Sequence, residues 1–109
     1  MEAKPRKRRT YKTEDGAEPF LDWLKSVRPF QGVIGKVLVR LKRAEEGNFG
    51  DHEPVGEGVI ELRIGGYGPG YRVYIGLDGE EIVLLWGGTK QTQEDDIKTA
   101  RRFWRDYNA

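Results

Sequence analysis

Residues 59–86, VIELRIGGYGPGYRVYIGLDGEEIVLLW, hold three runs of strand-forming residues separated by two turn signals. The first signal is the glycine-dense segment 65–70, and the second is the dipeptide Asp78–Gly79, which favours a tight hairpin. β-Branched and aromatic residues are frequent in the runs between them. The stretch therefore predicts three consecutive antiparallel strands, over Val59–Ile64, Tyr71–Leu77 and Glu81–Trp86.

The first two runs alternate in side-chain character, which assigns the faces of the predicted sheet. The apolar residues of one face are Ile60, Leu62, Ile64, Tyr71, Val73 and Ile75, and the opposite face carries Glu61, Arg63, Arg72 and Tyr74. We expect the first face to be buried and the second to be open. The third run is almost entirely apolar, which is typical of a strand covered on both sides.

The segments before these strands have the periodicity of amphipathic helices. Asp15 is expected to cap a first helix over Ala17–Val27. A second helix is expected over Phe30–Glu46, where Gly47 ends it. Because their connection is short, the two helices should form a helical hairpin that packs on the sheet.

The remaining elements complete the predicted order. A last helix is expected over Thr92–Tyr107 after Gly87–Gly88 end the third strand, and the segment 48–57 is expected to be a loop. A short edge strand over Arg9–Lys12 would precede the helical hairpin. The order β-α-α-β-β-β-α predicts an α+β fold, in which the helical hairpin lies on an antiparallel sheet of three to four strands.

The composition fits one folded domain over residues 9–109, behind a flexible basic tail at residues 1–8. There is no cysteine and His52 is the single histidine, so we expect no disulfide framework, metal centre or cofactor. No apolar run approaches the ~20 residues of a membrane span, and no signal-type segment follows the basic N-terminus. We therefore expect a cytoplasmic protein without a membrane partner.

The tail concentrates positive charge. The first twelve residues hold six Lys or Arg against one Glu, a net charge of +5, and the whole chain has +1, so residues 13–109 carry −4. Such a cluster can release counterions from RNA phosphates, and its candidate RNA-binding residues are Lys4, Arg6, Lys7, Arg8 and Arg9. The alternative is a solvated extension without a ligand.

Three cations form the candidate catalytic cluster. Arg63 and Arg72 fall on the same expected open face of neighbouring strands, and Lys90 follows the third strand in a glycine-flanked loop. Guanidinium groups bind phosphate oxygens in bidentate fashion, and fixed cations stabilise the charge that develops during phosphodiester cleavage. Tyr74 shares this face and is a candidate for stacking on a nucleobase of RNA.

The same charges also permit a purely structural interpretation. In it, Arg63 pairs with Glu61, Glu81 or another surface acid. Arg72 would pair with Glu80, as charges on a sheet face commonly do. The spacing alone leaves both interpretations open.

Several motifs in combination resemble one known family. They are GNFGD at 47–51, PVGEGV at 54–59, ELRI at 61–64, YGPGYRVY at 67–74 and GGTKQTQ at 87–93, followed by Asp96, Ile97 and Ala100. Over roughly residues 10–105, the chain resembles the addiction-module killer proteins, the phage-related branch of the RelE/ParE toxin superfamily.

The resemblance implies a RelE-like fold, in which a helical hairpin and a C-terminal helix flank a twisted antiparallel sheet. It also implies the role of toxin in a type II toxin–antitoxin system, whose partner is an antitoxin with a helix-turn-helix DNA-binding domain. Arg63, Arg72 and Lys90 match the basic positions with which related toxins hold and cleave messenger RNA in the ribosomal decoding site. The implied activity is that of a ribosome-dependent, metal-independent endoribonuclease that inhibits translation. In that reaction the ribose 2′-hydroxyl attacks the adjacent phosphate and leaves a cyclic phosphate.

The chain departs from the family pattern in its acid and base residues. Several related nucleases place a histidine or tyrosine near the C-terminus, whereas this chain has no histidine there and Tyr107 has the helical spacing of a packed residue. Glu61 is a candidate general base, and its alternative role is to orient Arg63. The resemblance therefore leaves the general acid and base unassigned.

Two other functions stay open at this point. A ParE-like inhibitor would bind DNA gyrase and need no nuclease chemistry, which would fit the missing histidine and the acidic body of the chain. An inactive prophage remnant would bind its antitoxin and have no other effect.

Overall fold

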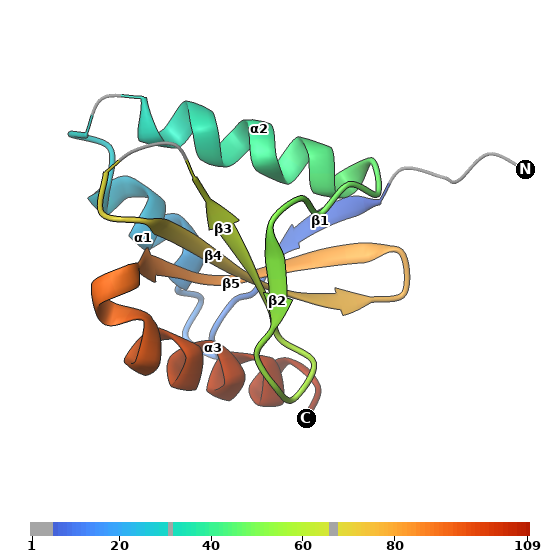
Figure 1. The fold of residues 1–109 in the computed structure, drawn as a ribbon. Helices are drawn as coiled ribbons and strands as arrows, with labels where there is room; N and C mark the ends of the chain where they lie inside the picture. The colour runs from blue at the N-terminus through green and yellow to red at the C-terminus, as the bar shows by residue number, and fades with distance from the viewer. Residues whose placement is uncertain (1–5, 31, 66–67) are drawn as a thin grey trace, which may run out of the picture.

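A computed structural model describes residues 6–30, 32–65 and 68–109 and has a mixed α+β fold, as predicted. Within these ranges no helix is both long and apolar enough to cross a membrane. In chain order the elements are β1 (Lys7–Thr10), α1 (Pro19–Ser26), α2 (Val33–Glu45), β2 (His52–Pro54), β3 (Ile60–Ile64), β4 (Tyr71–Asp78), β5 (Glu81–Thr89), the 3₁₀ turn η1 (Lys90–Thr92) and α3 (Gln93–Tyr107) (Figure 1).

The described strands form one sheet in the order β1-β5-β4-β3-β2, so the prediction of three to four antiparallel strands is wrong in number and in direction. The meander β3-β4-β5 is confirmed, but β1 pairs with β5 in parallel. The extra strand β2 lies in the segment 48–57, which we expected to be a loop. Its three residues pair with the outer edge of β3, where Pro54 is tolerated because that strand is at the edge of the sheet.

The sheet also includes part of the expected tail. β1 begins at Lys7, two residues before the predicted edge strand, so Lys7 and Arg8 are not part of a flexible extension. Just before it, the Arg6 amide donates to the Glu45 carbonyl at 2.6 Å. The predicted RNA-binding residue Lys4 lies outside the described residues.

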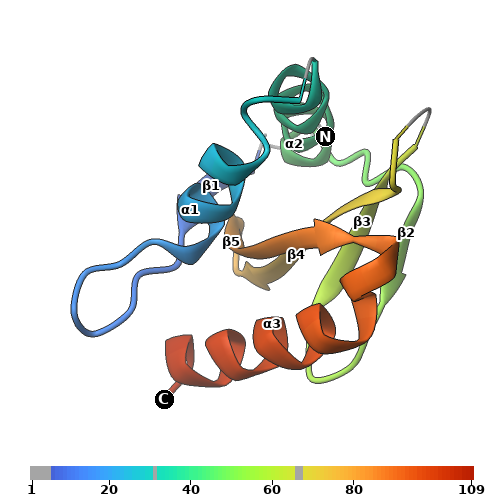
Figure 2. The same cartoon turned by 90° about the vertical axis from the view of Figure 1, so that its left-hand side faces the viewer.

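Helices cover both faces of the sheet, with α1 and α2 on one side and α3 on the other (Figure 2). The face of Leu62 and Val73 packs on the helical hairpin, as predicted. The prediction that the opposite face is open is wrong, because Glu61 and Tyr74 on it are 0% exposed. The apolar side of α3 covers this face and contributes the buried Ala100 and Trp104.

Both helices of the hairpin begin later in the sequence than predicted. α1 begins at Pro19 rather than Ala17. Asp15 does not cap it, because the residue at the N-cap position is Glu18. The Asp15 carboxylate instead accepts a hydrogen bond from the Thr13 hydroxyl, which lowers the pKa of Asp15. α2 begins at Val33 after Gly32, which has a φ of +79°.

The hairpin and the last strand are each longer than predicted. Asp78 pairs with Glu81, so the two-residue loop is Gly79–Glu80, with Gly79 at a φ of +57°. β5 does not end at Gly87–Gly88 but continues through them to Thr89. The last strand therefore leads directly into η1, which precedes α3.

Tyr11 joins the end of β1 to α3, and its titration predicts a loss of stability at alkaline pH. The buried hydroxyl donates to Asp106 at 2.6 Å, and burial together with that carboxylate raises the pKa of Tyr11 to about 12. The folded pKa exceeds the ordinary value of 10.0, so this stabilisation is complete below pH 10 and is lost as the pH rises towards 12. We expect Tyr11→Phe to flatten the fall in unfolding free energy over this window, measured by urea denaturation at successive pH values. An equally steep fall in the variant would contradict this assignment.

Candidate functional site

A buried carboxylate organises the candidate site. Glu61 lies in β3 beneath α3 and is 0% exposed. Its Oε1 accepts the Nε–H of Arg63 at 3.1 Å, and its Oε2 accepts the hydroxyl of Tyr74 at 3.2 Å and the side-chain amide of Gln93 at 2.9 Å. Arg72 Nε lies 3.7 Å from the same Oε2. One carboxylate therefore holds side chains from β3, β4 and α3.

Arg63 and Arg72 lie directly opposite each other on β3 and β4, as the alternation predicted. The side chain of Arg63 is 33% exposed and pairs with Glu61, with Glu53 and, at 3.8 Å, with Asp51. The hydrogen bond to Glu61 raises the pKa of Arg63 above its already high value. Three carboxylates thus compensate this guanidinium, which leaves it little capacity for a further anion.

Arg72 is more deeply placed and has fewer partners. Its side chain is 11% exposed, Nη1 donates to the Gly70 carbonyl at 3.4 Å, and Nε is buried without a hydrogen-bond partner. The predicted structural partner Glu80 does not contact it among the described interactions. The carboxylate that faces Arg72 is Glu61, which also pairs with Arg63, so one negative charge compensates two arginines.

Lys90 approaches Arg72 at the end of the sheet. Its backbone amide donates to the Gly70 carbonyl at 2.9 Å, which fixes the start of η1 against the turn before β4. A Cβ placed on Gly70 would lie 3.2 Å from Lys90 Cβ and 3.7 Å from Arg72 Nη1. The Lys90 side chain is exposed, and no carboxylate of the described residues lies within ion-pair distance of it. Lys90 and Arg72 therefore form the part of the cluster that can receive an external anion.

Tyr74 cannot stack on a nucleobase in this structure, so that prediction is wrong. Its ring is 0% exposed and packs between the sheet and α3. Burial, followed by the charge of Glu61, raises the pKa of Tyr74 well above its ordinary value. The parity of the strand placed it on the correct face, but α3 covers that face.

The burial of Glu61 decides between the two roles considered for it. A general base must reach the proton of a bound substrate. Glu61 has no exposed surface, and both of its oxygens already accept hydrogen bonds. The geometry favours the second role, in which Glu61 orients the arginines.

The N-terminal cations lie away from this cluster. β1 pairs with β5 from Glu81 onward, whereas Arg72 pairs with Gly88, seven residues further along β5. At roughly 3.3 Å per residue, the two places are about 20 Å apart. Three of these cations have partners there: Arg6 with the Gly79 carbonyl, Arg8 with Glu45 and Arg9 with Glu81. Lys7 lies beside them in β1.

Three partners of the site were missed from the sequence. Asp51 and Glu53 belong to the segment expected to be a loop. The sequence signal for them was that the two acids stand two residues apart, as side chains on one face of a strand do, and this segment pairs with the strand of Glu61. Gln93 is the first residue of α3 and lies within the 87–93 motif, although only the fold brings it to Glu61. Across the described ranges, no group of three or more Asp, Glu or His side chains is placed to hold a metal ion.

Comparison with known proteins identifies one relative. No family model matches the chain, and no solved structure matches it. A protein of Haemophilus influenzae (strain ATCC 51907 / DSM 11121 / KW20 / Rd), described as an uncharacterized protein, is 43% identical over 83 residues, which cover 75% of this chain and 82% of its own length. The chain therefore belongs to the same family as this H. influenzae protein.

Proposed function

We propose that the chain is the toxin of a type II toxin–antitoxin system, that its fold is RelE-like, and that it cleaves ribosome-bound messenger RNA without a metal ion. The observation that carries the proposal is that Arg72 and the exposed Lys90 both lie beside Gly70 at one end of the sheet, with Arg63 opposite Arg72. Each of the three cations belongs to one of the motifs that resemble the toxin family, ELRI at 61–64, YGPGYRVY at 67–74 and GGTKQTQ at 87–93. The placement of two helices on one sheet face and one on the other also agrees with a RelE-like fold.

The proposed reaction needs positive charge at the phosphate. The 2′-hydroxyl of the ribose loses its proton as its oxygen forms a bond to the adjacent phosphorus and the bond from phosphorus to the 5′-oxygen breaks. A proton is taken up by the leaving 5′-oxygen, so that the products are a 2′,3′-cyclic phosphate and a 5′-hydroxyl. Negative charge grows on the non-bridging oxygens, where Lys90 and Arg72 can stabilise it. Glu61 is a positioning residue that holds the Arg72 side chain from below.

The proposal includes two partners besides messenger RNA. The ribosome would present the substrate, and an antitoxin with a helix-turn-helix DNA-binding domain would neutralise the toxin. Both follow from the resemblance of the motifs. Arg63 is already paired with three acids, so the phosphate contact is assigned chiefly to Arg72 and Lys90.

The test is removal of the two cations that can meet the phosphate. We expect Arg72→Ala to reduce mRNA cleavage by roughly 100- to 1000-fold, the effect of deleting one donor to a developing oxyanion. Lys90→Ala should reduce it in the same direction without loss of folding, because that side chain is exposed. The measurement is primer extension on cellular mRNA after brief induction, with growth arrest followed in parallel.

Arg105→Ala is the matched control, since it also removes an arginine and an ion pair, at 2.7 Å to Glu57, but in the last turn of α3, at the end of the helix away from Gln93. It should cleave at full strength. Undiminished cleavage and growth arrest by both Arg72→Ala and Lys90→Ala would overturn the proposal. DNA breaks that precede any loss of mRNA would identify a gyrase inhibitor instead, and harmless expression without antitoxin would identify an inactive remnant.

A further inference from the structure

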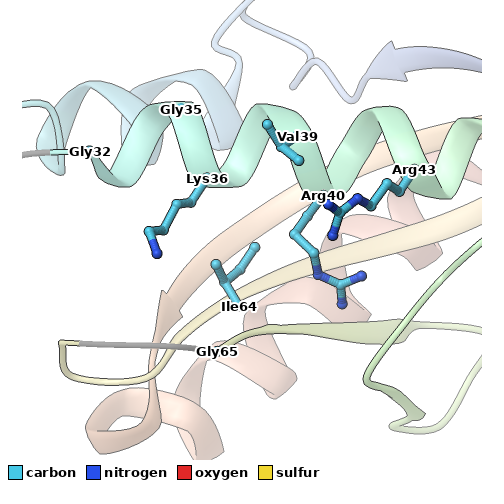
Figure 3. A pocket seen from close by; sticks show the side chains of 8 residues that line it. All are labelled: Gly32, Gly35, Lys36, Val39, Arg40, Arg43, Ile64 and Gly65. Carbon is cyan, nitrogen blue, oxygen red and sulfur yellow. The ribbon is translucent and has the colours of Figure 1, made fainter.

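An aromatic pocket lies where α1, the end of β5 and the start of α3 meet. It has a volume of about 460 Å³. β1 pairs with β5 only as far as Leu84, so none of the described strands covers this side of β5 beyond that residue. Four rings line the pocket, those of Trp23, Phe30, Tyr71 and Trp86. By contrast, the described lining of the groove between α2 and the end of β3 contains no aromatic side chain (Figure 3).

Phe30 is the ring of this pocket that faces solvent. It is 57% exposed, whereas Trp23 and Tyr71 are 8% and 6% exposed. Its backbone is held on both sides, because its amide donates to the Val27 carbonyl at 3.0 Å and its carbonyl accepts the Val33 amide at 3.3 Å. Aromatic rings stack on one another in an offset arrangement. The pocket therefore offers a flat ligand buried rings inside and a stacking surface at its mouth.

The polar lining of the pocket accepts hydrogen bonds. Asp96 is 8% exposed, and its Oδ1 accepts the indole N–H of Trp86 at 2.9 Å while its Oδ2 accepts the Thr92 hydroxyl. A carboxylate oxygen has about two acceptor positions, so each oxygen retains one. The Ser26 hydroxyl donates to the Trp23 carbonyl, which leaves its oxygen as an acceptor too. A ligand that fits must bring N–H donors, best of all two that point in the same direction.

The pocket adjoins the cations assigned to the phosphate. Lys90 stands in the chain between Thr89 and Thr92, and both of these residues line the pocket. Its exposed side chain lies beside Arg72 at the turn before β4. A nucleotide joins a flat base to a phosphate through one sugar, which matches this combination. Aromatic rings and a carboxylate also attract cationic side chains, but Lys90 and Arg72 would repel such a ligand.

We propose that this pocket binds a guanine base whose phosphate lies on Lys90. Guanine presents two parallel N–H donors, from its ring N1 and its 2-amino group, which would donate to the two oxygens of Asp96. The base would stack on Phe30. That this guanine belongs to the messenger RNA nucleotide at the cleaved phosphate rests on the proposed function; the affinity of the pocket for a guanine nucleotide does not.

The test is titration of the full chain with guanosine monophosphate, followed by the fluorescence of the tryptophans, two of which line the pocket. Inosine monophosphate lacks only the 2-amino group. We expect it to bind about tenfold more weakly, since a donor to a buried carboxylate is lost. Asp96→Asn should abolish this difference. Asp95→Asn is the control, because it neutralises an exposed acid of the same helical turn outside the pocket, and it should keep the difference.

Two exposed side chains test the stacking and the phosphate contact without emptying the core. Phe30→Ala should weaken guanosine monophosphate binding about tenfold, as loss of a stacking ring does. Leu38→Ala removes another exposed apolar side chain, 43% exposed and outside this pocket, and should change the affinity less than about twofold. Lys90→Ala should weaken binding of the nucleotide but not of guanosine, because only the nucleotide carries a phosphate.

Equal affinity for the guanosine and inosine nucleotides, or no binding of either, would overturn the proposal. So would tighter binding of arginine amide, which would identify a site for a cationic side chain. The link to messenger RNA has its own readout, since Asp96→Asn should remove a preference for guanine beside the cleaved bond in primer extension. These titrations do not depend on cleavage, and the effect of Arg72→Ala on cleavage does not depend on them, so a failure of the pocket and a failure of the proposed function remain distinct.

Discussion

Replacement of Glu61 by alanine is expected to lower the free energy of unfolding by about 3–5 kcal/mol, the usual cost of removing one member of a buried ion pair. Glu61 is fully buried and receives hydrogen bonds from Arg63, Tyr74 and Gln93. Without it, the Tyr74 hydroxyl is left beneath α3 with no acceptor. Arg72, whose side chain is 11% exposed, loses its only described acidic partner. Urea denaturation of the two chains measures the difference.

Glu53→Ala is the matched control for this effect. Glu53 pairs with the same arginine, Arg63, but its side chain is 55% exposed. Exposed pairs contribute little, so its removal should cost less than about 1 kcal/mol. Similar losses in the two variants would show that burial of the carboxylate does not govern the stability of the cluster. Glu61→Gln, which keeps the shape and one acceptor oxygen, should fall between them.

The alternation of strand residues predicted much of this cluster. Glu61, Arg63 and Arg72 were expected on one face, and the pairing of Arg63 with Arg72 follows from the meander. Parity does not say what covers a face, however. The prediction placed α3 beside the sheet and left the polar face open. In the structure the apolar side of α3 packs on that face and buries Glu61 and Tyr74.

The short strands β1 and β2 could not be predicted correctly from the sequence for a different reason. All three residues of β2 are exposed, and so are three of the four residues of β1, so neither strand has an apolar pattern of its own. Their conformation is set by pairing with the free edges of β3 and β5. Asp51 and Glu53 reach Arg63 only through that pairing, which explains why the site acquired acids that the sequence did not predict.

The role of the glycine pair at 87–88 also could not be predicted from the local sequence. Two adjacent glycines are typical of a strand end. Here they lie inside β5, and because they have no side chains, the side chains of Trp23 and Asp96 can pack directly against the strand backbone. A Cβ on Gly87 would overlap the indole ring of Trp23, and one on Gly88 would overlap the Asp96 carboxylate. Such contacts join α1 and α3 to the strand and have no local sequence signal.

Gly87→Ala should therefore destabilise the fold by about 1–3 kcal/mol through overpacking against Trp23. The indole is 8% exposed and packs in the core between α1 and the sheet, so it cannot move aside into solvent without losing that packing. Equilibrium urea unfolding is the measurement. Gly65→Ala is the control, because a Cβ there meets nothing within 4 Å, and it should change stability by less than about 0.5 kcal/mol.

A double-mutant cycle separates this clash from the ordinary cost of a larger residue in a strand. Trp23→Ala alone should cost about 3–5 kcal/mol, since it empties a large buried volume. In that background the methyl group of Gly87→Ala has room, so the second substitution should cost less than about 0.5 kcal/mol. The resulting coupling of about 1–3 kcal/mol would assign the effect to the contact between Trp23 and residue 87. Strict additivity would mean that the strand requires glycine at this position for its backbone alone, and that the close approach of α1 has no part in it.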